Sequence, residues 1–314
     1  MNMTTGNTSS KLRFTKFFQY LVLFTILAIF ILIALGGTVR VTESGLGCPD
    51  WPLCHGQIIP PFEKTALIEY SHRLVASIIS ILVLTVFLIG WKFYRNERWI
   101  FIPTIASIAI LTLQIALGAI TVLMELPPLI VLVHLATAQA LLACMIFIYL
   151  ALMLGSSRIQ LKKNHIPILS LITLATTFVI IISGSYVTAT NASSACGQSW
   201  PLCLGQIIPA EYPKAMINSF HRYIVFIVTI LISLTMIKTW GYRDQSRYIA
   251  FLIPLVVFIF ILQIFIGAAI WKLTDISTGL IKVLHLAIAT ASWGTLFGLF
   301  IVTWFNKSTT LTKE

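Results

Sequence analysis

Residues 48–61 read CPDWPLCHGQIIPP, and the chain continues with EYSHRL at 69–74. The same pattern returns as CGQSWPLCLGQIIPA at 196–210 and NSFHRY at 218–223. A second match follows each copy: TLQIALGAI and VLVHLATA after the first, FILQIFIGAAI and KVLHLAIA after the second. Solenoid repeats are far shorter, roughly 20–50 residues. The pattern therefore predicts two matching halves of one protein.

The composition is that of an integral membrane protein. Hydrophobic residues make up 58% of the chain and charged residues only 10%, whereas a soluble domain carries about 25% charge. Continuous apolar runs near the ~20 residues of a spanning helix favour helices over barrel strands. We place eight transmembrane helices at 17–39, 67–90, 99–122, 129–154, 166–187, 217–239, 248–271 and 279–304. The expected fold is all-α, with two pseudo-symmetric four-helix bundles.

The repeat divides the chain into a first half at 17–154 and a second half at 166–305, with a linker at 155–165 and tails at 1–16 and 306–314. The two tails and the loops on the same side of the membrane contain 14 Lys and Arg residues, whereas the loops on the other side contain 5. The positive-inside rule places both termini in the cytoplasm and the cysteine loops outside a cell membrane. The net charge of +11 then reflects topology and anionic lipid. No nucleic-acid partner is expected, because the basic residues are scattered.

Each of the two long outer loops contains one cysteine pair. Disulfides persist outside the cytoplasm, and both pairs, Cys48–Cys54 and Cys196–Cys203, can close a small ring where the geometry allows. Each bridge could simply pin its loop to the bundle. It could also be redox-active, because small exposed rings can be reducible.

Four histidines lie at matching depths: His72, His134, His221 and His285. His72 and His134 each fall about five residues into a predicted helix, roughly 7–9 Å below the outer interface. A single such histidine could be a hydrogen-bonded packing residue. Here the second and fourth helices run in the same direction, so His72 and His134 can face each other, as can His221 and His285. Bundles build cofactor sites from facing helices, and ionisable groups inside membranes are functional candidates.

Two facing histidines fit a haem better than a bare zinc or copper ion. A bare ion usually takes three or four ligands, and no other duplicated ligand lies at that depth. A haem takes one axial ligand on each face. Arg73 and Arg222 directly follow two of the histidines. They could bind haem propionates or reach the lipid headgroups instead.

Several motifs together resemble one family. They are E-x-x-H-R at 69–73, the C…WPLC…GQIIP loops, LQ-x-x-x-G before the fourth and eighth helices, and the four histidines. The combination is similar to the haem A synthase family, of the bacterial type with a cysteine pair in each outer loop. The resemblance extends from about Gly36 to Phe305, and no single motif alone would carry it.

The resemblance implies a division of labour between the halves. His221 and His285 would bind a haem b cofactor, and His72 and His134 would belong to the site where the substrate, haem o, is oxidised. The implied reaction converts the C8 methyl group of haem o into a formyl group through a hydroxymethyl intermediate. Its product, haem A, would supply cytochrome oxidase. The family's essential acidic residue matches Glu69.

The halves differ at this acid. Glu69 stands three residues before His72, on the same helical face, and its counterpart before His221 is Asn218. Oxidising a methyl group removes protons as well as electrons, and a partly buried carboxyl group can be tuned to accept them. We therefore expect catalysis by Glu69 in the first half and electron transfer in the second. The alternative is an interfacial glutamate paired with Arg73.

Some alternatives stay open at this stage. A di-haem b-type cytochrome that only transfers electrons would show the same four histidines, although it would not explain Glu69. A repeat-built transporter is a third possibility, but it would favour helices broken at the midplane. Two axial histidines leave iron no open position, so either one dissociates or electron withdrawal precedes attack by water. A haem o synthase and an electron acceptor such as a quinone are the expected partners.

Overall fold

The computed structural model describes residues 5–155, 166–270 and 277–305. Those residues form eight α-helices, all long and apolar enough to cross a membrane, and no extended β-strand. The predicted all-α membrane fold is confirmed. The helices are α1 (Thr5–Val41), α2 (Lys64–Phe93), α3 (Arg98–Leu123), α4 (Pro128–Leu154), α5 (Ile166–Ala189), α6 (Pro213–Trp240), α7 (Arg247–Ala269) and α8 (Ser277–Phe305).

The helix ends differ slightly from the predicted ones. Helix α1 begins at Thr5, so most of the predicted tail at 1–16 continues the first helix. Helices α4 and α6 each begin at a proline, a residue suited to the first turn because its missing N–H would have no partner there. Most of the predicted linker, 156–165, and the tail at 306–314 lie outside the described residues.

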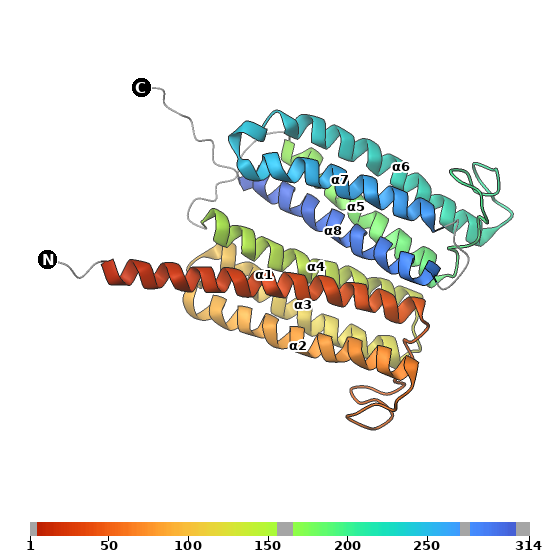
Figure 1. Cartoon of the computed structure of the whole chain (residues 1–314), viewed down its shortest axis with the longest axis horizontal. Coiled ribbons are helices and arrows are strands. Elements are labelled where there is room, and N and C mark those ends of the chain that lie inside the picture. The colour runs from red at the N-terminus through yellow and green to blue at the C-terminus, as the bar shows by residue number, and fades with distance from the viewer. Residues whose placement is uncertain (1–4, 156–165, 271–276, 306–314) are drawn as a thin grey trace.

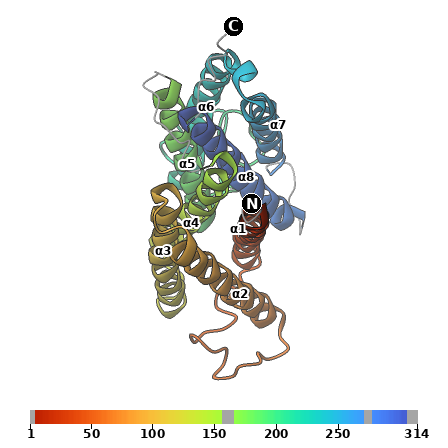
Figure 2. The ribbon, with the colours of Figure 1, turned by 90° about the vertical axis from the view of Figure 1, so that its left-hand side faces the viewer.

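The two halves lie side by side, with α1–α4 in one and α5–α8 in the other (Figure 1). In the view along the bundle, α2 and α3 lie on one flank and α6 and α7 on the opposite flank (Figure 2). The halves meet through α1, α4, α5 and α8. This arrangement is consistent with the predicted pseudo-symmetry. A buried hydrogen bond of 2.7 Å from Gln139 Nε2 to Thr290 Oγ1 joins α4 to α8 across the boundary.

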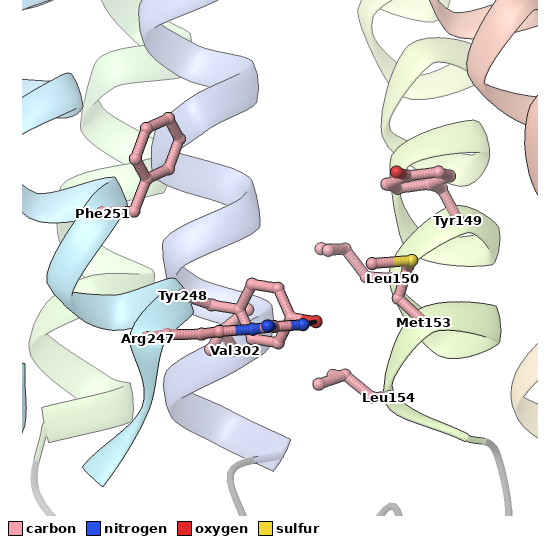
Figure 3. Close-up of a pocket in the computed structure, with 8 residues that line it drawn as sticks. All are labelled: Tyr149, Leu150, Met153, Leu154, Arg247, Tyr248, Phe251 and Val302. Carbon is pink, nitrogen blue, oxygen red and sulfur yellow. Dashed lines mark hydrogen bonds between the residues drawn. The ribbon is translucent and has the colours of Figure 1, made fainter. Parts of the chain in front are cut away.

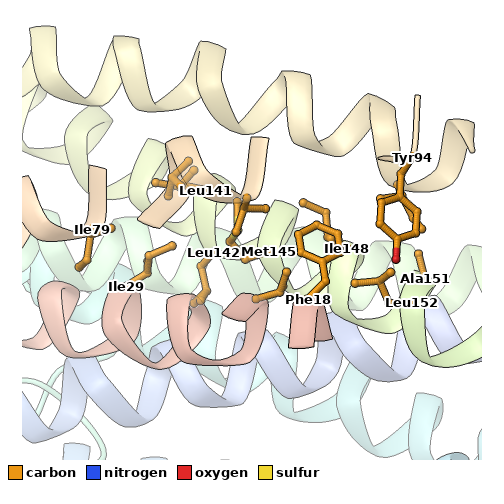
Figure 4. Close-up of a cluster of buried hydrophobic side chains, with 14 of the residues drawn as sticks. Phe18, Ile29, Ile79, Tyr94, Leu141, Leu142, Met145, Ile148, Ala151 and Leu152 are labelled. Carbon is orange, nitrogen blue, oxygen red and sulfur yellow. The ribbon is translucent and has the colours of Figure 1, made fainter. Parts of the chain in front are cut away.

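Each half has its own apolar core. In the first, Phe18 and Ile29 of α1, Ile79 of α2, and Met145 and Ile148 of α4 are almost fully buried (Figure 4). A second core is centred on α6, α7 and α8. Many large apolar side chains point outward instead, and Ile81, Phe226 and Phe258 are all more than 60% exposed. Such extensive exposed apolar surface is suited to lipid.

Both cysteine loops emerge at one end of the bundle, while α1 begins and α8 ends at the other (Figure 1). Each pair forms a disulfide, Cys48–Cys54 and Cys196–Cys203. In both loops the second cysteine exchanges two backbone hydrogen bonds with the glutamine three residues later. The disulfides pack on alanines in the first turns of α2 and α6. The loops therefore share one local structure and one docking position.

Candidate functional site

The four predicted histidines lie early in the even-numbered helices, near the end that carries the cysteine loops. His72 of α2 lies within electrostatic range of His134 of α4, and His221 of α6 within range of His285 of α8. All four imidazoles are half-buried. The structure thus brings together the pairs that the repeat predicted, one in each half.

Each histidine packs against a glycine on the preceding, odd-numbered helix. A β-carbon added to each glycine would lie close to Cε1 of its histidine. The distances would be 3.2 Å from Gly36 to His72, 3.4 Å from Gly118 to His134, 3.1 Å from Gly184 to His221 and 2.7 Å from Gly267 to His285. Three of these distances are shorter than ordinary carbon contacts of about 3.5–4.0 Å, and the fourth is at that limit. The absent side chain lets each imidazole lie against the backbone of its neighbour, which fixes the ring position.

Three of the histidines also contact polar side chains. Ser183 Oγ lies 2.8 Å from His221 Nδ1. Gln114 Nε2 lies 3.3 Å from His134 Nε2, and Gln263 Nε2 lies 3.3 Å from the corresponding atom of His285. The two glutamines come from the LQ-x-x-x-G motifs, one turn before the glycines that pack on the same histidines. This motif therefore positions the histidines of α4 and α8.

The donor set fits a haem. Within the described ranges, no three or more His, Cys, Asp or Glu side chains cluster as metal ligands. Each half offers two imidazoles from facing helices, which is the number that a planar tetrapyrrole leaves for axial ligation. His72, His134 and His285 keep a buried Nδ1 without a hydrogen-bond partner in the part of the chain that the structure describes.

The acid that distinguishes the halves is buried. Glu69 is 5% exposed and accepts a hydrogen bond of 3.0 Å from Arg73 Nε, with which it forms an ion pair. In the second half, Arg222 Nε donates to Asn218 Oδ1 over the same 3.0 Å. Asn218 uses its amide nitrogen to donate to the Ala192 carbonyl, a contact that a carboxylate cannot make. The two positions match in shape and differ in charge and in hydrogen-bonding role.

Arg73 and Arg222 reach into the cysteine loops. Arg73 donates over 2.7 Å to the backbone carbonyls of Cys48, Asp50 and Leu53. Arg222 makes matching bonds of 2.9–3.1 Å to three carbonyls of the second loop. The two arginines therefore tie the loops to α2 and α6. Their binding of haem propionates stays a prediction.

Asp50 organises the first loop. Its carboxylate accepts hydrogen bonds from the backbone N–H groups of His55, at 2.6 Å, and Gly56, at 2.7 Å. The hydrogen bond from Gly56 is the main cause that lowers the pKa of Asp50. In the second loop, Ser199 accepts from Leu204 N–H instead. The same turn is thus held by a charged acceptor in one half and a neutral one in the other.

A cavity of about 410 Å³ lies between the halves, at the end of the bundle away from the histidines. Figure 3 shows Leu150 and Met153 of α4 facing Arg247, Tyr248 and Val302 across it. Its lining is almost entirely apolar. This cavity does not contain the candidate site, which lies between the helices near the opposite end.

The family model described as cytochrome oxidase assembly protein, COX15-CtaA, matches residues 19–65 and 61–297. The chain belongs to the COX15-CtaA family. It is 28% identical over 271 residues to a protein named heme A synthase from Alkalihalophilus pseudofirmus, covering 84% of this chain and 91% of that protein. A protein of the same name from Shouchella clausii is 30% identical, with 78% of this chain and 84% of that protein covered. Another from Halalkalibacterium halodurans is 31% identical, with 71% of this chain and 76% of that protein covered. The family resemblance seen in the sequence is confirmed.

Sequence reasoning did not assign the residues that support the histidines in this COX15-CtaA chain. Two of these residues do not recur in the other half. Leu35 stands at the position that matches Ser183, and Ile288 stands at the position that matches Thr137, the residue that contacts Gln114 Oε1. The glycines do recur between the halves, but recurrence alone fits general helix packing. An alignment of the halves anchored on the histidines would have revealed both the shared glycines and the unshared hydroxyls.

Proposed function

We propose that this protein is a haem A synthase, a membrane oxidoreductase whose substrate is haem o. The observation that carries the proposal is a pair of similar two-histidine sites that differ by one acid. Glu69 lies beside the first site and Asn218 beside the second. The relatives named heme A synthase support the same assignment.

The first half would be the catalytic half. Haem supplies the redox-active iron in each site when bound, and the histidines hold it. Converting the C8 methyl group to a formyl group, through a hydroxymethyl intermediate, releases protons as well as electrons. Glu69 lies one turn before His72 and keeps its carboxylate in place through Arg73, so it can accept a proton at the site. The amide of Asn218 cannot serve as such a base.

The second half would hold haem b between His221 and His285 and pass electrons. Electrons would leave through a partner such as a quinone, and a haem o synthase would deliver the substrate. Both termini would lie in the cytoplasm and the cysteine loops outside, as the charge distribution predicts. To bind a propionate, Arg73 or Arg222 would exchange a loop carbonyl for a haem carboxylate.

The test is the conversion of added haem o by the detergent-purified protein carrying Glu69→Gln. We expect conversion to fall by roughly 10²- to 10⁴-fold, the usual contribution of a general base, while haem binding persists. Asn218→Glu is the matched control and should create no second active site. Full conversion by the Glu69→Gln protein would contradict the role of Glu69. Bound haem b with no oxidised haem product from the parent protein would identify an electron-transferring cytochrome instead.

A further inference from the structure

Ser183 gives the Nδ1 atom of His221 a hydrogen-bond partner. The Ser183 hydroxyl donates to the Ile180 carbonyl at 2.9 Å, and a carbonyl oxygen can only accept. While its one proton points to that carbonyl, the hydroxyl oxygen can accept from the imidazole N–H across the 2.8 Å contact with His221 Nδ1. In this arrangement His221 carries its proton on Nδ1 and keeps the Nε2 lone pair for a metal. Such hydrogen bonds orient a histidine ligand and make it more basic.

The first half lacks this support. Leu35 precedes Gly36 as Ser183 precedes Gly184, and both glycines pack on the histidine of the next helix. A leucine offers no acceptor. His72 accordingly has a buried Nδ1 with no partner among the described residues. Packing on Gly36 positions the ring of His72, but no hydrogen bond to Nδ1 from the described residues sets its tautomer.

The glutamines beside His134 and His285 also differ between the halves, but here it is the first half that has the additional contact. Gln114 Nε2 contacts His134 Nε2, and because an amide nitrogen only donates, it occupies the lone pair that iron would use. Thr137 Oγ1 contacts Gln114 Oε1 as well as the backbone carbonyls of Val133 and His134, so its one proton can be donated to the amide oxygen. Thus Gln114 offers His134 a ready partner whenever that imidazole is not bound to iron.

In the second half, the matching glutamine, Gln263, lacks such a contact among the described residues. Ile288 stands at the position of Thr137. Gln263 Oε1 is buried and has no hydrogen-bond partner in the described part of the chain. The Gln263 amide contacts His285 but lacks the second hydrogen bond that would hold it there.

We propose that the two halves are built for different haem exchange. The second half retains its haem through Ser183 and His221. The first half exchanges its haem, with His134 as the ligand that leaves iron and pairs with Gln114, held by Thr137. The inference rests on the proposed function and deepens it, because a substrate site must release its product whereas a cofactor site must keep its haem.

Carbon monoxide tests the first half, because it binds reduced iron only where a ligand has left. The full chain is purified with haem b bound, and a background with both His221→Ala and His285→Ala removes the second site and isolates the first. We expect Thr137→Ile to slow carbon monoxide binding there by roughly fivefold, the effect of losing one hydrogen bond. A background with both His72→Ala and His134→Ala isolates the second site, where binding should be slow and Ile288→Thr should accelerate it. Equal rates at the two parent sites would overturn the inference.

Haem transfer to apomyoglobin tests the second half. Ser183→Ala should accelerate haem loss from the second site by about 10- to 100-fold, as for other groups that orient metal ligands. Ser183→Thr keeps the hydroxyl group and should preserve retention. Retention by Ser183→Ala equal to that of the parent would contradict the role of Ser183. Both experiments measure haem binding without turnover. Unequal haem exchange at the two sites with no formation of haem A would therefore reject the proposed function alone. Formation of haem A with equal exchange at the two sites would reject this inference alone.

Discussion

Gly267→Ala should displace His285, which we propose as a haem ligand. The new β-carbon would lie 2.7 Å from Cε1 of His285, whereas carbon atoms pack at about 3.5–4.0 Å. The imidazole must therefore move by about 1 Å, far more than the ~0.2 Å by which metal–ligand distances vary. Overpacking of this kind costs about 1–3 kcal/mol. We expect the affinity for haem b to fall by roughly 10- to 100-fold.

The matched control is Gly118→Ala on the corresponding helix of the first half. Its β-carbon would lie 3.4 Å from Cε1 of His134, close to ordinary contact, so haem binding should change little. Alanine is the better helix former of the two residues by about 1 kcal/mol, so a loss of haem from Gly267→Ala would not come from weakening α7.

The assay is the haem-to-protein ratio and the visible spectrum of the purified variants. Gly267→Ala should lose haem b or show a five-coordinate spectrum, and Gly118→Ala should resemble the parent protein. Full haem b with an unchanged six-coordinate spectrum in Gly267→Ala, or equal haem loss from both variants, would contradict the role of Gly267.

Three further predictions concern the loops and the boundary between the halves. Arg73→Ala removes three hydrogen bonds to loop carbonyls, so proteolysis within the first cysteine loop should accelerate, and faster cleavage of the second loop alone would contradict this. The pKa of Asp50 is lowered in the folded loop, chiefly by the Gly56 N–H. Its stabilisation of the loop is therefore complete above the usual aspartate pKa of about 3.9 and is lost as the pH falls through the lowered value. Hydrogen exchange should show this acid opening in the first loop and not in the second, where Ser199 replaces Asp50. Thr290→Val leaves the buried Gln139 amide unpaired, which should cost about 1–3 kcal/mol in thermal unfolding, and adding Gln139→Leu should restore part of that loss.

The two halves of the protein share most of the features around the histidines and differ in a few. Both halves share the disulfide loop, the arginine that ties it down and two histidines backed by glycines. Around the histidines, three pairs of matching positions differ: Glu69 and Asn218, Leu35 and Ser183, Thr137 and Ile288. All three lie within one turn of one of the four histidines or of the glycine that packs on it. The scaffold is therefore doubled, while the chemistry around each histidine pair is not.

The sequence predicted the membrane fold and the choice of histidines because both depend on position along a helix. A run of apolar residues is long enough to span a bilayer or it is not. Helix geometry likewise fixes the depth of each histidine once the span is known. Glu69 and Asn218 were recognised in the same way, by comparing matching positions of the repeat.

The environment of each histidine was decided only by the tertiary structure. Sequence fixes how deep a side chain lies, but not how far away the next helix is or which of its faces is turned inward. The 2.7 Å approach at Gly267 and the 2.8 Å bond from His221 to Ser183 depend on interhelical packing. The arginines show the same limit, since the sequence placed them beside the histidines and only the folded loops show that they donate to backbone carbonyls. Distances between helices come from the packing of whole faces, and no single motif encodes them.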